Sequence, residues 1–134
     1  MRNIYFFLTA FALSFTLQAQ IINIPDTNFK NALVNTICAN TEYGSPNVNS
    51  DVDLNNDGEI QVSEAESIYY LDVSNQSISS LEGIEYFINL YGLSCDQNQI
   101  TELDLSAQTN LGYLDCGFNQ LAELNITNLS LIHI

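Results

Sequence analysis

The sequence predicts an α/β solenoid, in which stacked repeats with short parallel strands follow a small helical cap. Two observations predict it. A pattern led by leucine recurs with starts at Leu71, Leu93 and Leu114, which are 22 and then 21 residues apart. Upstream of it, apolar residues recur at helical spacing. The chain has 134 residues, which is room for one modest domain.

Each repeat opens with three residues that alternate with period 2, which predicts a short strand with its leading side chains facing inward. Five residues later comes an amide, which we expect inside the coil, bonded to backbone groups. Neighbouring repeats then complete the core. The aligned positions are Leu71, Leu93 and Leu114; Val73, Cys95 and Cys116; Gln76, Asn98 and Asn119; Ile78, Ile100 and Leu121; Leu81, Leu103 and Leu124. This spacing resembles the leucine-rich repeat, nearest to its 22-residue bacterial form.

We expect about three such repeats over residues 69–134. Ile132-His-Ile134 falls where Leu114-Asp-Cys116 lies in the previous repeat, so the array would break off inside a strand. Because repeat arrays generally need a capping unit, we expect a chain truncated at its C-terminus. His133, the one histidine, is expected to be a surface residue and not a metal ligand.

Residues 1–20 have the outline of a secretory signal peptide. Arg2 is followed by an apolar stretch from Ile4 to Leu17 and by the polar exit Gln18-Ala19-Gln20. Cleavage after Ala19 or after Gln20 is open. The alternative is an uncleaved anchor, but the apolar stretch is short against the roughly 20 residues that span a bilayer. We therefore expect a secreted or cell-surface protein with no membrane insertion after cleavage.

The charge excludes several classes of function. All 16 Asp and Glu follow position 20, and Lys30 is then the one basic residue, so the mature formal charge is 1 − 16 = −15. Such a surface repels phosphate backbones and anionic lipid, which excludes nucleic-acid binding. The sequence also has no Ser/His/Asp set, nucleophile elbow or phosphate-binding loop, so we do not expect an enzyme.

Residues 21–68 are expected to form the cap. Asp26 or Thr27 is a plausible N-cap of a first helix. A second, short helix is expected to begin at Ser63, and Thr41–Asn49 to be an irregular loop. The apolar positions at helical spacing in the first helix are Phe29, Ala32, Leu33, Thr36 and Ile37.

Within the cap, residues 53–64 match the EF-hand pattern Asp-x-Asx-x-Asx-Gly-x5-Glu at every specified position. Calcium takes roughly six to eight oxygen ligands, and this spacing turns alternate oxygens inward. Gly58 permits the sharp turn, and Ile60 is expected to pack inward. The expected ligands of one Ca²⁺ are the side chains of Asp53, Asn55 and Asp57, the backbone carbonyl of Glu59, Gln61 directly or through water, and bidentate Glu64. The alternative is an Asp/Asn-rich turn that binds nothing.

No second intact loop is present in the sequence, which argues against a calcium sensor and favours a permanent structural clamp. The three cysteines are Cys38, Cys95 and Cys116. The last two share the inward column of Val73, so reduced core thiols are favoured over a disulfide, although export permits one. Cys38 has no place in the pattern.

The sequence resembles exported leucine-rich-repeat proteins of Bacteroidetes. The resembling segments are Ile24–Leu33, Asn55–Ala65, Leu71–Ser74 and Leu114–Leu121. The resemblance implies a helical cap with a calcium loop, exposure outside the cell and binding of a ligand. It also implies further repeats, often followed by a sorting domain for type IX secretion.

The leading functional hypothesis is a binding module for a protein or glycan, adhesive or recognition-type, that uses the outward strand residues. One alternative is that these strand residues are simply solvated. The other is that the segment is a structural spacer and that the activity of the protein lies downstream of it. The outward positions are Tyr70, Asp72 and Ser74; Gly92, Ser94 and Asp96; Tyr113, Asp115 and Gly117.

Overall fold

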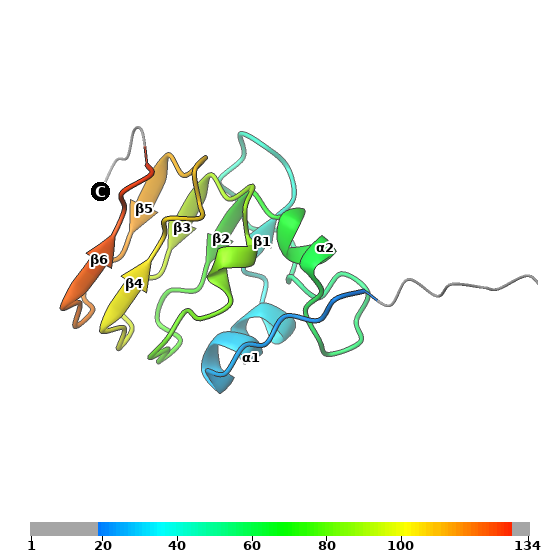
Figure 1. Ribbon diagram of the computed structural model, residues 1–134. Helices are drawn as coiled ribbons and strands as arrows, with labels where there is room; N and C mark the ends of the chain where they lie inside the picture. The colour runs from blue at the N-terminus through cyan, green and yellow to red at the C-terminus, as the bar shows by residue number, and fades with distance from the viewer. Residues whose placement is uncertain (1–18, 130–134) are drawn as a thin grey trace, which may run out of the picture.

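The computed structural model describes residues 19–129 (Figure 1). The expected signal peptide, the strand at Ile132–Ile134 and His133 lie outside the described residues, apart from positions 19 and 20. In chain order the elements are α1 (Thr27–Asn35), β1 (Ala39–Asn40), α2 (Val62–Glu66), β2 (Tyr70–Asp72), the 3-10 helix η1 (Ile84–Tyr86), β3 (Gly92–Ser94), β4 (Glu102–Asp104), β5 (Tyr113–Asp115) and β6 (Glu123–Asn125).

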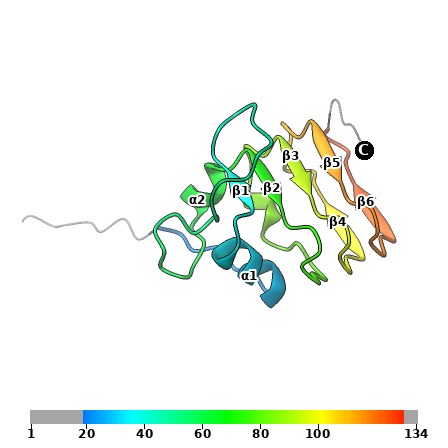
Figure 2. The same ribbon diagram turned by 180° about the vertical axis from the view of Figure 1, so that it is seen from behind.

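The main sheet has the order β1-β2-β3-β5 (Figure 2). Strands β2, β3 and β5 run parallel, and Leu71, Leu93 and Leu114 lie side by side in register. The three predicted strands and their alignment are thus confirmed, each beginning one residue before its leading leucine. The antiparallel edge strand β1, which pairs Ala39 with Leu71, was not predicted.

A second, smaller sheet forms the opposite layer of the repeats. Strands β4 and β6 pair in parallel, with Leu103 beside Leu124, and both views place them across from the main sheet. The sequence indicated these leucines only as core positions; Leu103 is buried as expected, whereas Leu124 is 37% exposed. A run as short as Glu102–Asp104 has no strand signature of its own, and its pairing follows from the stacking of repeats.

The predicted amide inside the coil is confirmed for Asn98 and Asn119. Gln76, the predicted amide of the first repeat, is exposed, so the prediction was wrong at that position. Asn98 Oδ1 accepts from the backbone N–H groups of Gln76 and Ile78, both at 3.0 Å. Its Nδ2 donates to the Val73 carbonyl at 2.9 Å. In the next repeat, Asn119 Oδ1 accepts from a backbone N–H and its Nδ2 donates to carbonyls in the same way. Asn98 therefore closes the backbone where it leaves β2, and Asn119 where it leaves β3.

Helix α1 packs Phe29 and Leu33 into the core, as expected. It ends earlier than predicted, because Thr36 is extended and its Oγ1 donates to the Ala32 carbonyl at 2.6 Å. Ile37 lies beyond the helix and is 68% exposed, so its prediction as a helical apolar position was wrong. Helix α2 likewise begins at Val62, one residue before the predicted start.

The cysteines Cys38, Cys95 and Cys116 are all free. Cys38 is buried beneath α1, where its Sγ donates to the Ala32 carbonyl at 3.3 Å. Cys95 is fully buried, as the inward column predicts. Burial raises the pKa of both thiols to about 12, so they are protonated at neutral pH and poor nucleophiles.

Asp26, one of the two residues predicted as the N-cap, is the N-cap of α1 and connects the cap to the repeats. Its Oδ1 accepts from the backbone N–H groups of Asn28 and Phe29 in the first turn of α1. Its Oδ2 accepts from Ser79 and Ser80 in the first repeat, at 2.8 and 3.0 Å. One carboxylate therefore fixes the angle between helix and repeats. No helix between residues 19 and 129 is long and apolar enough to cross a membrane.

Candidate functional site

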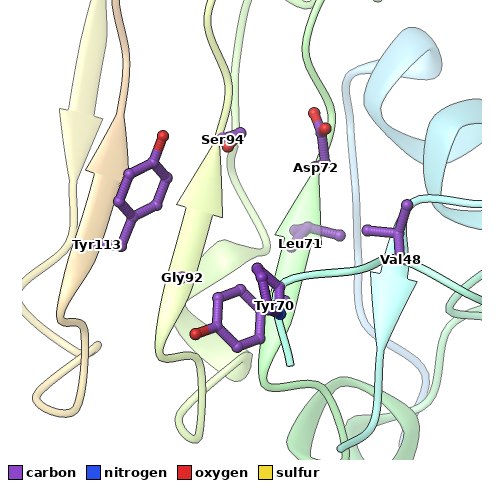
Figure 3. A pocket seen from close by; sticks show the side chains of 8 residues that line it. Val48, Tyr70, Leu71, Asp72, Gly92, Ser94 and Tyr113 are labelled. Atoms are coloured by element: carbon purple, nitrogen blue, oxygen red, sulfur yellow. The ribbon is translucent and has the colours of Figure 1, made fainter. Parts of the chain in front are cut away.

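A cavity of about 300 Å³ opens on the face of the main sheet (Figure 3). Strands β2, β3 and β5 form its floor, and a loop of the cap forms one wall. We call it the strand-face cavity; it is lined by Pro46, Val48, Tyr70, Leu71, Asp72, Gly92, Ser94 and Tyr113.

The cavity brings together five of the predicted outward residues, Tyr70, Asp72, Gly92, Ser94 and Tyr113. The predicted residues Ser74, Asp96, Asp115 and Gly117 do not line it. Ser74 and Asp96 follow strands β2 and β3, and Asp115 ends strand β5.

Glycine at position 92 makes room for an aromatic ring. A Cβ on Gly92 would stand 2.4 Å from the Cδ1 and Cε1 atoms of Tyr70, which would be a severe steric clash. The ring of Tyr70 also packs edge-on against Tyr91, with centroids 5.7 Å apart. Tyr91 in turn packs edge-on against Tyr43 of the cap loop at 5.5 Å. Tyr70 is therefore held between the cap and the second repeat, while Tyr113 is 43% exposed.

Desolvation in this cluster, with smaller contributions from Tyr91 and Tyr43, raises the pKa of the Tyr70 phenol. The ring is therefore neutral at physiological pH. It presents an apolar face with a hydroxyl as a polar tip, a combination common at binding surfaces.

The aspartates of the strand face accept hydrogen bonds from groups in the turns next to their strands. Asp72 Oδ1 accepts from the Ser74 backbone N–H, and Asp115 Oδ1 accepts from that of Gly117, both at 3.1 Å. The Ser74 hydroxyl and then the Gln97 amide lower the pKa of Asp96. The turns after Asp72 and Asp115 therefore each occupy one carboxylate oxygen.

Sequence reasoning missed Pro46 and Val48, which form the apolar wall. The loop that carries them is anchored by buried Asn40, whose Nδ2 donates to the carbonyls of Ser45 and Asn47. Asn40 Oδ1 accepts from the Glu42 N–H at 2.6 Å. The Gly and Pro of this segment indicated a loop, but no pattern in the sequence shows which surface a loop covers.

The second site is the loop of residues 53–64. Asp53 is buried, and its two oxygens accept from the backbone N–H groups of Asp57 at 3.0 Å and Gly58 at 2.8 Å. Gly58 has a φ of +82°, which side chains other than glycine rarely adopt, so the predicted sharp turn is confirmed.

Glu64 closes the loop from the first turn of α2. Its Oε1 accepts from the Asn55 N–H at 3.1 Å and its Oε2 from the Gln61 N–H at 3.0 Å. Ile60 is fully buried, as expected, and its carbonyl accepts from the Ile22 N–H at 2.8 Å. The start of the described chain therefore pairs with the loop, through this bond and an antiparallel bridge between Ile21 and Gln61.

Asn55, Asp57 and Gln61 converge within the loop. Asn55 Nδ2 donates to Gln61 Oε1 at 2.8 Å, and both amides donate to Asp57 Oδ2, at 3.1 and 2.9 Å. The amide hydrogens thus supply positive charge to the loop oxygens. A half-turn of either amide would present an oxygen instead, so the donor set fits a hard cation.

Across residues 19–129, no three His, Cys, Asp or Glu side chains gather as a metal-binding group. In this arrangement the loop carboxylates bond to backbone N–H groups and amides. The side chain of Glu59 turns outward to Lys30 of α1, with Oε2 2.7 Å from Nζ. It therefore leaves only its predicted backbone carbonyl for a cation.

Comparison with known proteins supports the fold. No family model and no curated protein matches the chain. Among solved structures it is similar to the functional domain of InlJ from Listeria monocytogenes, which includes a cysteine ladder. The TM-score there is 0.60 and the identity 32%, over 85% of this chain and 23% of that one. An internalin, inlF, from Listeria monocytogenes matches with a TM-score of 0.57 and 26% identity, over 89% of this chain and 33% of that one.

The CBM51-2 and INT domains of ZmpB from Clostridium perfringens also match, with a TM-score of 0.53 and 27% identity. That match covers 72% of this chain and 17% of that one. The chain thus spans a third or less of each of these structures. Together with the register of β2, β3 and β5, the internalin matches show a leucine-rich-repeat fold.

Proposed function

We propose that this chain is part of an exported, calcium-stabilised leucine-rich-repeat module that binds a protein or glycan outside the cell. The strand-face cavity carries the proposal, because it gathers two tyrosines, a carboxylate and a hydroxyl from three successive strands. Pockets with an apolar lining and a few convergent polar groups are the usual form of a binding site. The likeness to internalins supports an adhesive or recognition role.

The proposal predicts that removing an aromatic ring from the cavity abolishes binding. The full-length exported protein would be tested against protein and glycan arrays, with Tyr113→Ala as the variant. Phe118→Ala is the matched control, because Phe118 is 86% exposed but lies outside the cavity. We expect a ligand that the control retains and Tyr113→Ala loses. An array without any ligand, or a ligand that Tyr113→Ala still binds, would refute the role of the cavity.

The calcium part of the proposal rests on the donor set of residues 53–64. One Ca²⁺ would be held by side-chain oxygens of Asp53, Asn55 and Asp57, with Gln61 and bidentate Glu64 completing the shell beside the Glu59 carbonyl. The ion would replace the amide hydrogens that now serve these oxygens. A single loop, paired with the start of the mature chain, suits a permanent clamp that joins the cap to the first repeat.

Calcium should raise the melting temperature relative to chelator. With a Kd on the order of 10⁻⁴ to 10⁻³ M, as in extracellular modules, saturating calcium is worth about 1.4 to 2.7 kcal/mol at ten to a hundred times Kd. Asp53→Ala and Glu64→Ala should lose this increment. Should either fail to fold, exposed Asp57→Ala tests the same site.

Glu59→Gln is the matched control within the loop, because only its backbone carbonyl is expected to bind. It should keep the calcium-dependent increment in differential scanning fluorimetry. Identical melts with calcium and with chelator would reject a calcium clamp and leave the binding proposal to its own test.

A further inference from the structure

The charge on the strand face is one-sided. Lys30 is the one basic residue after position 2, and it lies on α1, paired with Glu59 at 2.7 Å. The strand face carries Asp72, Asp96 and Asp115. A ligand with phosphate, sulfate or carboxylate groups would therefore meet repulsion without a compensating cation, whereas a cationic ligand would be attracted.

The cavity has two aromatic side chains at equivalent positions of strands β2 and β5. Between them, on β3, stands Gly92, which has no side chain to separate the two rings (Figure 3). Tyr70 is fixed by its edge-on contact with Tyr91, so little conformational entropy is lost when a ligand packs on it. The faces of tyrosine rings attract cations, and guanidinium groups most often.

A carboxylate lies beside these rings. Asp72 Oδ1 is engaged by the Ser74 N–H, but no group within residues 19–129 donates a hydrogen bond to Asp72 Oδ2. The wall formed by Pro46 and Val48 of the cap loop, on the β2 side of the cavity, is apolar. Arginine combines an apolar stem with a planar cation that hydrogen-bonds carboxylates.

We infer that the strand-face cavity takes one arginine side chain of a protein ligand, with the guanidinium between Asp72 and the tyrosine rings and the stem against Pro46 and Val48. This inference rests on the proposed binding function and names its ligand chemistry. A volume of about 300 Å³ matches one long side chain and lies at the lower end of small-molecule pockets. A neutral sugar could also stack on the rings, but it leaves the acidic charge unused.

NMR titration of the isotope-labelled chain tests the inference, because it detects millimolar affinities. The probe is N-acetyl-arginine methylamide. Its control is the citrulline analogue, which has the same shape but no charge. We expect the arginine probe to shift the backbone amides of Tyr70, Gly92 and Tyr113, and the citrulline probe to bind at least about tenfold more weakly.

Two variants separate the site from the general acidity. Asp72→Asn should weaken arginine binding about tenfold. Asp104→Asn removes the same charge and has the same turn, since Asp104 Oδ1 accepts from the Ser106 N–H at 2.9 Å, but it lies in the opposite layer on β4. It should leave binding unchanged. Equal losses in both variants would reduce the effect to net charge and overturn the inference.

Equal shifts with arginine and citrulline would also overturn it, as would no shift with arginine. A methyl glycoside is the third probe. Shifts at the cavity with the glycoside and not with arginine would refute the arginine site while supporting a glycan-binding function. The array experiment with Tyr113→Ala tests the binding function independently, so failure of the two proposals can be distinguished.

Discussion

In the repeats, an asparagine amide closes the turn after β2 and another closes the turn after β3: buried Asn98 and half-buried Asn119 both accept from backbone N–H groups and donate to carbonyls. In the cap, carboxylates do the corresponding work. Asp26, Asp53 and Glu64 each accept two or more backbone N–H groups. Both regions satisfy buried backbone, but one does so with neutral groups and the other with charged ones.

This difference determines how each region responds to its surroundings. An amide carries no charge and does not titrate, so the hydrogen bonds of Asn98 and Asn119 should be insensitive to pH and to cations. A carboxylate makes stronger hydrogen bonds but loses them on protonation and gains from a bound cation. The cap should therefore be the region through which solution conditions act on stability.

The largest effect is expected in the repeats, where a neutral asparagine holds the backbone. Asn98→Ala removes the acceptor of the buried Ile78 N–H and the half-buried Gln76 N–H, and the side-chain donor to the buried Val73 carbonyl, and should lower the free energy of unfolding by about 3 kcal/mol. Asn110→Ala is the control, because its exposed amide makes one contact of 3.4 Å with the Ile88 carbonyl. Chemical denaturation measures both. A loss below about 0.5 kcal/mol for Asn98→Ala, which is the size expected of a surface substitution, would contradict the role of Asn98 in closing the turn after β2.

The next largest effect is expected in the cap, where the carboxylate of Asp26 holds the backbone. Asp26→Ala removes the N-cap of α1 and the acceptor for Ser79 and Ser80, and should cost about 2 kcal/mol. Asp26→Asn keeps one acceptor oxygen and should cost less. Hydrogen exchange should show the loss of protection at α1 before the strands. Uniform loss over the whole chain would show that cap and repeats unfold as one unit.

The smallest effect sharpens the comparison through pH. Partial burial raises the pKa of Asp26, but backbone hydrogen bonds from Phe29, Ser79, Ser80 and Asn28 outweigh it and hold the pKa below its ordinary value of 3.8. A depressed pKa stabilises the fold above the unfolded pKa, and this stability is lost as pH falls through the folded pKa.

Wild type should accordingly lose melting temperature below about pH 4. Asp26→Asn should lose less of it over that interval, because its amide does not titrate. Asp104→Asn is the comparison variant: Ser106 lowers the pKa of Asp104 as well, but Asp104 is exposed, so solvent screens its hydrogen bonds and the variant should change the acid response less than Asp26→Asn does. Parallel profiles of melting temperature against pH for wild type and Asp26→Asn would show that Asp26 does not contribute to the loss of stability in acid.

Much of the fold follows from local pattern. The spacing of Leu71, Leu93 and Leu114 predicts the register of the main sheet, because stacked repeats must align equivalent residues. Asp26 was readable as an N-cap, and Gly58 as a turn residue with positive φ. Ile37 was misread, because apolar periodicity continues past the point where an extended Thr36 ends the helix.

The two candidate sites also differ in how much of each could be predicted from local sequence. The loop of residues 53–64 could be located from sequence because all its donors lie within 12 consecutive residues, where spacing determines direction. Half of the strand-face cavity could be located as well, since outward strand positions alternate with core positions. Pro46 and Val48 could not, because they reach the cavity by the path of a loop that Asn40 holds.

The sequence by itself determined the repeat length, the inward leucines, the asparagine ladder and the acidic charge, since each follows from periodicity or composition. Only the tertiary structure decided that β4 pairs with β6, that Cys38 lies under α1, and that a loop of the cap closes one side of the tyrosine pair. The physical reason is the range of the interactions. Spacing along the chain encodes contacts between equivalent positions, whereas contacts between unlike segments depend on how the whole core packs.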